Sequence, residues 1–183
     1  MSDRAITIPI TASRWIGVAV VDWESAGLDG FYPADVPDDW HLTYYANMAM
    51  AVVLPPSRWL TADTSLLAQW SEQTHENFWF YLLCESKEQV LQAIQLVGAF
   101  NDKCAGLIVA ADVHVEEVDS VAVLVLGQSA LRCDTGNLRA LGAQISAWLT
   151  GFSGEHGLVV LDGQLAGKVK EVQTLLELMG VLS

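Results

Sequence analysis

Basic residues are scarce in this chain. Lys and Arg together number 9 against 22 Asp and Glu, so the formal net charge is -13. Proteins that bind nucleic acid or an anionic membrane surface do so through clustered Lys and Arg, and the basic residues here are scattered along the chain. We therefore expect no nucleic acid and no membrane among the partners of this protein.

Long apolar runs and paired cysteines are missing as well. The longest apolar runs, 15–21 and 121–126, are far too short for a helix that spans a bilayer, which takes about 20 residues. The N-terminal residues contain no apolar core of the kind that a secretory signal needs. Cys84, Cys104 and Cys133 lie far apart and form no CxxC pair, which is typical of reduced thiols. These features predict a cytoplasmic protein.

The common motifs of catalysis and cofactor binding are also absent. The chain contains neither GxxxxGK[ST] nor GxGxxG, so it offers no glycine-rich loop for a nucleotide phosphate. No Ser–His–acid or Cys–His–acid set can be assembled from the spacing. His41, His75 and His156 lack ligand spacing, and we interpret them as surface residues. We therefore expect no cofactor and no resident metal.

What the chain does contain is an alternation of strands and helices. Short apolar runs rich in β-branched and aromatic residues indicate strands, and apolar residues at i, i+3 and i+4 behind a capping residue indicate helices. Strands are predicted over 15–21, 48–54, 78–84, 106–111, 121–126 and 157–161. Helices are predicted over 40–47, 64–73, 87–100, 135–149 and 166–179, with caps at Asp63 or Thr64, at Ser86, and at Asp134 or Thr135. An edge strand is predicted over 5–10.

This order predicts one α/β domain with parallel strands joined by right-handed crossovers. A hydrophobic fraction of 52% with 17% charged residues suits a sheet that is covered on both faces. An open doubly wound sheet and a (β/α) barrel both satisfy the pattern.

The segment 22–47, DWESAGLDGFYPADVPDDWHLTYYAN, is the most informative part of the chain. With the strand before it, this segment resembles the N-terminal signature of the YecE-like proteins, a family of unknown function with a TIM-barrel fold. That signature is a strand with IGTSGW, then W-x-G-x-FYP, then a helix with YY or YA. The matching residues here are Ile16, Gly17, Trp23, Gly30, Phe31, Tyr32, Pro33, Leu42, Tyr44, Tyr45 and Ala46.

The resemblance implies a barrel, but the chain is shorter than the roughly 250 residues of a full one. The missing length falls between Asp112 and Val121. We therefore predict a reduced or incomplete (β/α) barrel, with an open parallel sheet as the alternative. Removing strands leaves exposed parallel edges that must be covered, so we also expect either a homodimer or the strand 5–10 to cover the gap.

The departures from the family's pattern bear on function. Its second strand ends in VEIN-TFY, where this chain has Val53, Leu54 and Pro55, and Leu126 stands where the family has His. These losses favour a non-catalytic binding or interaction module. The alternative is a small-molecule enzyme, possibly metal-assisted, whose ligand and substrate the sequence leaves unknown.

Candidate site residues come from two sets. The first set follows the predicted strands and consists of Asp22, Glu85, Asp112, His114 and Asp162. In a parallel sheet these side chains would converge where the strands end, as metal ligands or acid–base groups. The alternative is that each acid only caps the next helix. The second set consists of aromatic residues that either line a ligand pocket or pack as a lid over one end of the fold; it consists of Trp23, Phe31, Tyr32 and Tyr44. Packing is the favoured interpretation of the second set.

Overall fold

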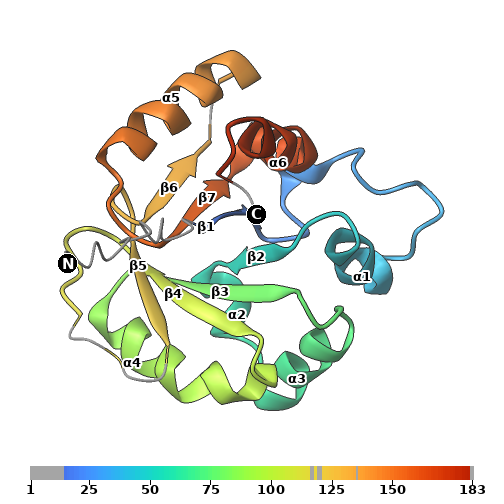
Figure 1. Ribbon diagram of the computed structural model, residues 1–183. Coiled ribbons are helices and arrows are strands. Elements are labelled where there is room, and N and C mark those ends of the chain that lie inside the picture. The colour runs from blue at the N-terminus through green and yellow to red at the C-terminus, as the bar shows by residue number, and fades with distance from the viewer. Residues whose placement is uncertain (1–14, 116–117, 119–120, 135, 182–183) are drawn as a thin grey trace, which may run out of the picture.

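The seven strands in the described part of the chain run parallel in one sheet. The computed structural model describes residues 15–115, 118, 121–134 and 136–181, so the predicted strand 5–10 lies outside the described residues. The sheet order is β5-β4-β3-β2-β1-β7-β6. The strands are β1 (Trp15–Val21), β2 (Ala51–Leu54), β3 (Trp79–Cys84), β4 (Cys104–Val109), β5 (Ala122–Val125), β6 (Ala130–Cys133) and β7 (His156–Leu161). The sheet curls into a nearly closed barrel with one unsealed seam, which confirms the predicted incomplete barrel over the open sheet (Figure 1).

The helices surround the outer face of this barrel (Figure 1). They are α1 (His41–Ala46), α2 (Pro56–Trp59), α3 (Thr64–Glu72), α4 (Lys87–Leu96), α5 (Leu138–Gly151) and α6 (Val169–Leu178). Short 3-10 helices accompany them: η1 (Ala26–Leu28), η2 (Asp38–Trp40), η3 (Val97–Phe100) and η4 (Gly163–Lys168). The side chain of Asp63 accepts a hydrogen bond from the Leu66 amide, and the side chain of Ser86 accepts one from the Gln89 amide, as predicted.

Two separate apolar clusters follow from the alternation of side chains along each strand. One cluster combines outward-facing strand residues such as Val20 and Val52 with residues from the surrounding helices. The other contains strand residues only, among them Ala19, Val53 and Tyr81, and fills the inside of the barrel. The interior is therefore a packed core rather than a channel, as in other parallel barrels.

The seam lies where the alternation of strands and helices breaks down. Among the described residues no helix separates β4 from β5, and a turn at Gly127 (φ 83°) leads directly from β5 to β6. The Gly127 amide donates to the carbonyl of Ala130 at 2.8 Å. The two four-residue edge strands, β5 paired with β4 and β6 paired with β7, face the gap, and Leu126 after β5 forms an isolated bridge with Ala130 of β6.

Three local predictions need correction. Strand β6 (Ala130–Cys133) was not predicted, because its four residues ALRC show no clear period. The residues after Pro55 were predicted as a turn but form α2, since a proline at the first position of a helix loses no internal hydrogen bond. Helix α5 begins at Leu138 and is capped by Asn137, whose side chain accepts from the Ala140 amide, and not by residue 134 or 135.

The aromatic segment 22–47 lies against the outside of the barrel. Its buried side chains, which include Trp23, Leu28 and Tyr45, all belong to the cluster shared with the helices. None of them belongs to the cluster inside the barrel. The predicted lid over one end of the fold is therefore wrong, because the apolar side chains of this segment are buried against the outward face of the sheet.

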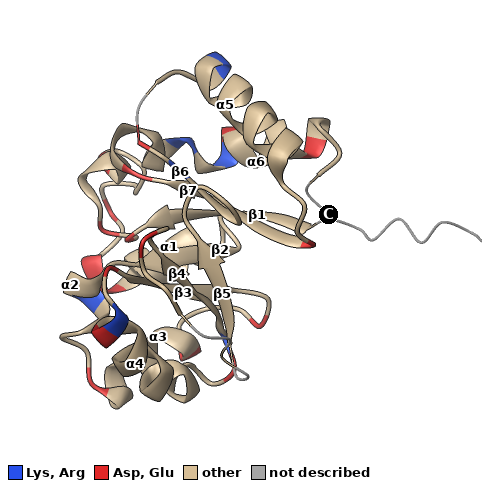
Figure 2. Ribbon diagram, turned by 90° about the vertical axis from the view of Figure 1, so that its left-hand side faces the viewer, with Lys and Arg blue, Asp and Glu red and all other residues tan. Residues whose placement is uncertain are grey.

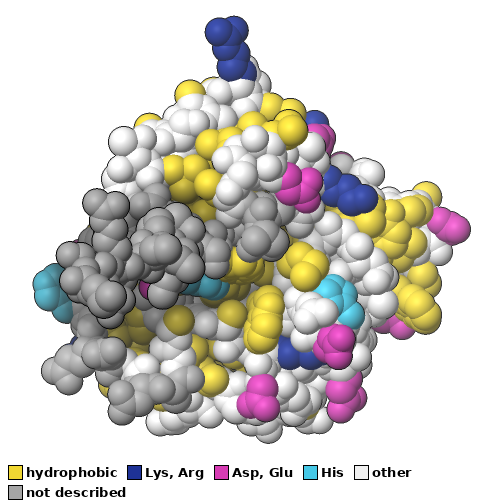
Figure 3. Space-filling view, viewed as in Figure 1, with side chains coloured by type: hydrophobic (Ala, Val, Ile, Leu, Met, Phe, Trp, Pro, Cys, Tyr) yellow, Lys and Arg dark blue, Asp and Glu magenta, His cyan; other side chains and the backbone are white. Residues whose placement is uncertain are grey.

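Charged residues are sparse on the molecule, and acids outnumber bases along the ribbon (Figure 2). In the space-filling view, hydrophobic side chains reach the surface in several places between polar atoms (Figure 3). No helix in the described part of the chain is both long and apolar enough to cross a bilayer.

Candidate functional site

The loop between β1 and α1 begins with an unusual backbone conformation. Asp22 has a φ of 60°, in the left-handed region that few residues other than glycine adopt. Its amide still donates to the carbonyl of Val53 on β2 at 2.9 Å. The chain thus turns away from the sheet immediately after β1, at the end of the barrel where the strands finish.

Arg58 holds the start of this loop. It lies in α2, directly after β2, and its Nη2 donates to Asp22 Oδ1 at 2.7 Å and to Glu24 Oε2 at 2.7 Å. Its Nε donates to Asp22 Oδ2 at 3.2 Å, so the guanidinium binds Asp22 through two atoms. The guanidinium carbon also lies 4.8 Å from the ring centroid of Trp23, a distance typical of a cation–π contact.

The predicted aromatic residues mostly pack against one another. Trp23 is buried, with its ring 5.1 Å from that of Trp70. Phe31 contacts Tyr32 edge-on at 5.1 Å and Tyr44 at 5.9 Å. The Tyr32 hydroxyl donates to the Trp23 carbonyl. Of these four aromatic residues, only Tyr32 lines the cavity that the loop encloses.

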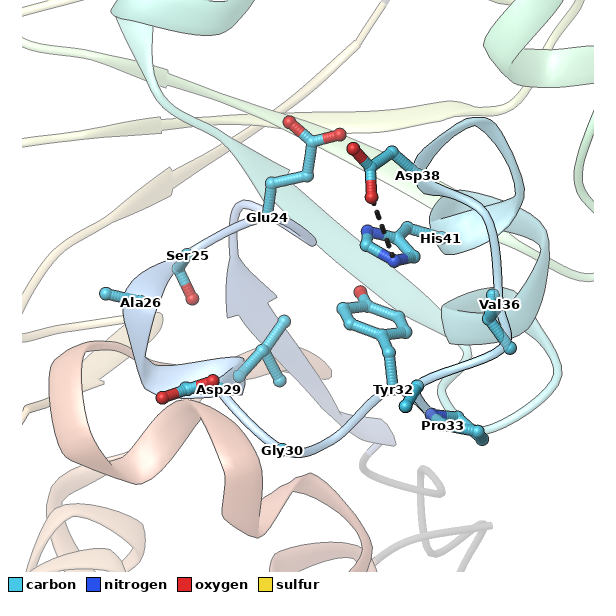
Figure 4. A pocket seen from close by; sticks show the side chains of 12 residues that line it. Glu24, Ser25, Ala26, Asp29, Gly30, Tyr32, Pro33, Val36, Asp38 and His41 are labelled. Carbon is cyan, nitrogen blue, oxygen red and sulfur yellow. Dashed lines mark ion pairs between the residues drawn. The ribbon is translucent and has the colours of Figure 1, made fainter.

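That cavity has a volume of about 640 Å³ and is formed by residues 24–41 (Figure 4). The ring of Tyr32 stacks on the imidazole of His41, with centroids 4.0 Å apart and planes 8° apart. Asp38 Oδ1 lies 3.7 Å from His41 Nε2. Figure 4 shows Glu24 on the same side of the cavity as Asp38 and His41, whereas Asp29 lies at the opposite side.

The electrostatic character of the cavity is negative. Glu24, Asp29 and Asp38 line it, and no Lys or Arg among the described residues does. The pKa of Tyr32 is raised well above its ordinary value, mainly by burial and further by the charges of Glu24 and Asp22. Burial alone would lower the pKa of Arg58, but its bonds to Asp22 and Glu24 outweigh burial and raise it.

The hydroxyl of Ser25 is a further polar group at this cavity. Ser25 lines the cavity, and its Oγ is buried without a hydrogen-bond partner among the described residues. Because Ser25 Oγ is not bonded to His41, the cavity does not contain an assembled Ser–His–Asp triad. A buried hydroxyl without a partner costs free energy.

The strand-end residues predicted from the sequence do not gather around one point. Asp162 forms an ion pair with Arg132 of the neighbouring strand β6 and does not lie beside Asp22 in a shared site. Glu85, Asp112 and His114 are exposed, and none of their side chains forms an ion pair with another described residue. Within the described ranges, no group of three or more His, Cys, Asp or Glu is placed to hold a metal ion.

Comparison with known proteins gives no family. No family model, no curated protein and no solved structure matches the chain. The resemblance to the YecE-like proteins is therefore carried by the sequence signature alone.

Two contributors to the site were missed by sequence reasoning. Arg58 stands in the region where the family's Glu and Asn are replaced, so the region was interpreted only as a loss. His41 was interpreted as a surface residue, although it packs face to face on Tyr32. A basic residue close after β2, in a chain with so few of them, is the signal from which a partner for the carboxylate at the end of β1 could have been predicted.

Proposed function

We propose that this chain is a non-catalytic binding module that holds a small organic cation in the cavity of the β1–α1 loop. The observation that carries the proposal is the composition of the cavity wall. Three carboxylates and the stacked Tyr32–His41 pair line it, without Lys or Arg among the described residues. Carboxylates and aromatic faces together are the groups that recognise an ammonium ion.

The placement of Arg58 supports the same ligand. Arg58 pairs with Glu24, one of the carboxylates that line the cavity, and its Nε and Nη2 donate to Asp22 and Glu24. The charges of Asp29 and Asp38 are left without a basic partner among the described residues, apart from the contact of Asp38 with His41. An incoming ammonium group therefore meets uncompensated negative charge, and the net charge of -13 adds long-range attraction.

The described residues assemble no catalytic set at this cavity, which favours binding over catalysis. Two of the strand-end acids form ion pairs with arginine: Asp22 with Arg58 and Asp162 with Arg132. Asp29 and Asp38 also line the cavity, but neither is hydrogen-bonded to a Ser, Thr or Cys side chain among the described residues, so no pair of nucleophile and base is assembled there. The ion pairs instead fix the two loops in place, as a binding site on a rigid scaffold requires.

Isothermal titration calorimetry with three four-carbon compounds tests the proposal. Putrescine, 1,4-butanediol and succinate share one chain length and differ in charge. We expect putrescine to bind, with an affinity that falls as salt is added, and the other two not to bind. Equal binding of the diol and the diamine would show that charge does not select the ligand and would overturn the proposal.

Matched variants locate the binding. In Asp29→Asn/Asp38→Asn, both changed carboxylates line the cavity, and we expect putrescine affinity to fall roughly fivefold or more, as for two surface-exposed charge contacts. Asp35→Asn removes the same kind of charge from an exposed position of the same loop that does not line the cavity. The affinity of this control should be unchanged within about twofold.

We also propose the finer assignments that the sequence favours. The parallel, nearly closed barrel supports a relationship to the YecE-like family as a shortened member. The open seam between β5 and β6 supports a homodimer that covers it, and unpaired thiols at Cys84, Cys104 and Cys133 support a cytoplasmic location. Sedimentation velocity tests the dimer: a single monomeric species at micromolar concentration would contradict it.

A further inference from the structure

A second, chemically different cavity lies at the opposite end of the barrel, where the strands begin. Two adjoining hollows of about 360 and 260 Å³ share Trp15 and Trp79 as walls. Trp15 and Trp79 are the first residues of β1 and β3. Because the strands are parallel, this opening is separated by the length of the barrel from the loop cavity beside the end of β1.

Trp15 and Trp79 line both hollows, Asn77 and Gln173 add polar groups to the smaller one, and no charged side chain among the described residues lines either. Trp15 stacks on His156, with ring centroids 4.4 Å apart and an angle of 20° between planes. Gly17 makes this possible, because a Cβ at that position would lie 2.5 Å from Trp15 Cη2. The glycine therefore leaves room for the Trp15 indole to lie along β1, where it forms a flat wall of the cavity.

In the larger hollow, two of the lining residues form a polar pair. The hydroxyl of Tyr81, which is fully buried, lies 2.9 Å from His156 Nε2. No other acceptor for this hydroxyl is present among the described residues, and a buried hydroxyl proton left unbonded is costly. Tyr81 therefore donates to Nε2, which places the proton of the neutral imidazole on Nδ1.

His156, which lines the larger hollow, thus carries a hydrogen-bond donor at Nδ1. Burial lowers the pKa of His156, so the imidazole is neutral at pH 7.5, and its Nδ1 has no partner among the described residues. A cavity with apolar walls and one placed polar group is the usual form of a small-molecule site.

We propose that this end of the barrel binds an uncharged, flat aromatic molecule that accepts a hydrogen bond from His156 Nδ1. The indole walls select a planar ring, the lack of charged lining residues selects a neutral one, and the donor selects a ring with an acceptor atom. The site does not depend on the cation site, since the two share no residue.

Quinoline and naphthalene test the proposal, because they differ by one ring atom, the acceptor nitrogen. Binding is followed by tryptophan fluorescence of the full-length protein at pH 7.5. We expect quinoline to bind about three- to tenfold more tightly than naphthalene, as for one hydrogen bond. The permanently charged N-methylquinolinium should not bind at this site.

Two variants make the test specific. His156→Phe keeps a flat ring but removes the donor, so quinoline and naphthalene should then bind equally. Ala105→Leu fills part of the cavity from β4 and should weaken both ligands, with circular dichroism confirming that the fold persists. An unchanged preference for quinoline in His156→Phe would overturn the proposal. So would binding that appears only after residues 1–14 are removed, since the chain's own N-terminal segment would then be the occupant.

Discussion

Replacing Arg58 by Met tests how the loop after β1 is held. The substitution keeps a long apolar side chain over Trp23 and removes all hydrogen bonds to the two carboxylates. The side chains of Arg58, Asp22 and Glu24 are 23%, 20% and 41% exposed, so the bonds are only partly shielded from water. We take about 1 kcal/mol for each carboxylate, between the values for exposed and shielded charge-assisted bonds.

The loss of about 2 kcal/mol should lower the Tm by roughly 4–8 °C for a chain of this size. Differential scanning calorimetry measures it, with Arg139→Met as the matched control. Arg139 is an exposed residue of α5 without an ion pair to a described residue. The Tm of the Arg139→Met variant should therefore differ from that of the wild type by less than about 2 °C. An equal Tm in the Arg58→Met variant and the wild type would refute the structural role of this ion pair.

The same variant should bind putrescine more tightly. Without the guanidinium, Glu24 contributes an uncompensated charge to the cavity, and affinity should rise roughly threefold. The variant is therefore less stable and a better cation binder at once. A weaker affinity would mean that Arg58 contacts the ligand or shapes the cavity, and would contradict the assignment of a purely structural role.

Three further predictions concern buried groups. Tyr45→Phe removes a hydroxyl that accepts from the Val20 amide at 3.1 Å and donates to the Ala51 carbonyl at 2.7 Å, so the free energy of unfolding should fall by about 2–4 kcal/mol in urea denaturation. Because the pKa of His156 is lowered in the folded protein, the unfolded state binds a proton to this imidazole more readily. The contribution of neutral His156 to stability is therefore present above pH 6.5 and is lost as the pH falls below 6.5. His156→Phe should reduce the difference in the free energy of unfolding between pH 7.5 and pH 5.5. Burial raises the pKa of all three cysteine thiols, to about 11 or 12, so the native protein at pH 7 should react slowly with Ellman's reagent and quickly once it is unfolded.

The general fold could be predicted because strands buried on both faces leave a clear signal. Runs such as Trp15–Val21 are apolar without interruption, as parallel strands covered on both sides must be. Strand β6 could not be predicted from the sequence, because it contains Arg132, which forms an ion pair with Asp162 at the end of β7. A charged residue in a four-residue run gives no apolar period, and its ion pair exists only after the barrel has formed.

The site could be predicted only in part for a similar reason. The sequence placed Asp22 at the end of a strand and Tyr32 in an aromatic loop, and both lie at the site. Their partners come from other elements: Arg58 from α2 and His41 from α1. Which carboxylate an arginine contacts depends on how two loops lie in space, and the spacing within either loop does not carry that information.

Binding of an organic cation by the β1–α1 loop can be followed residue by residue with amide NMR during a putrescine titration. We expect saturable shifts for amides of residues 24–41, and none for the indole signals of Trp15 and Trp79 at the other end of the barrel. Shifts confined to those two indoles, or no shift at millimolar putrescine in low salt, would contradict it.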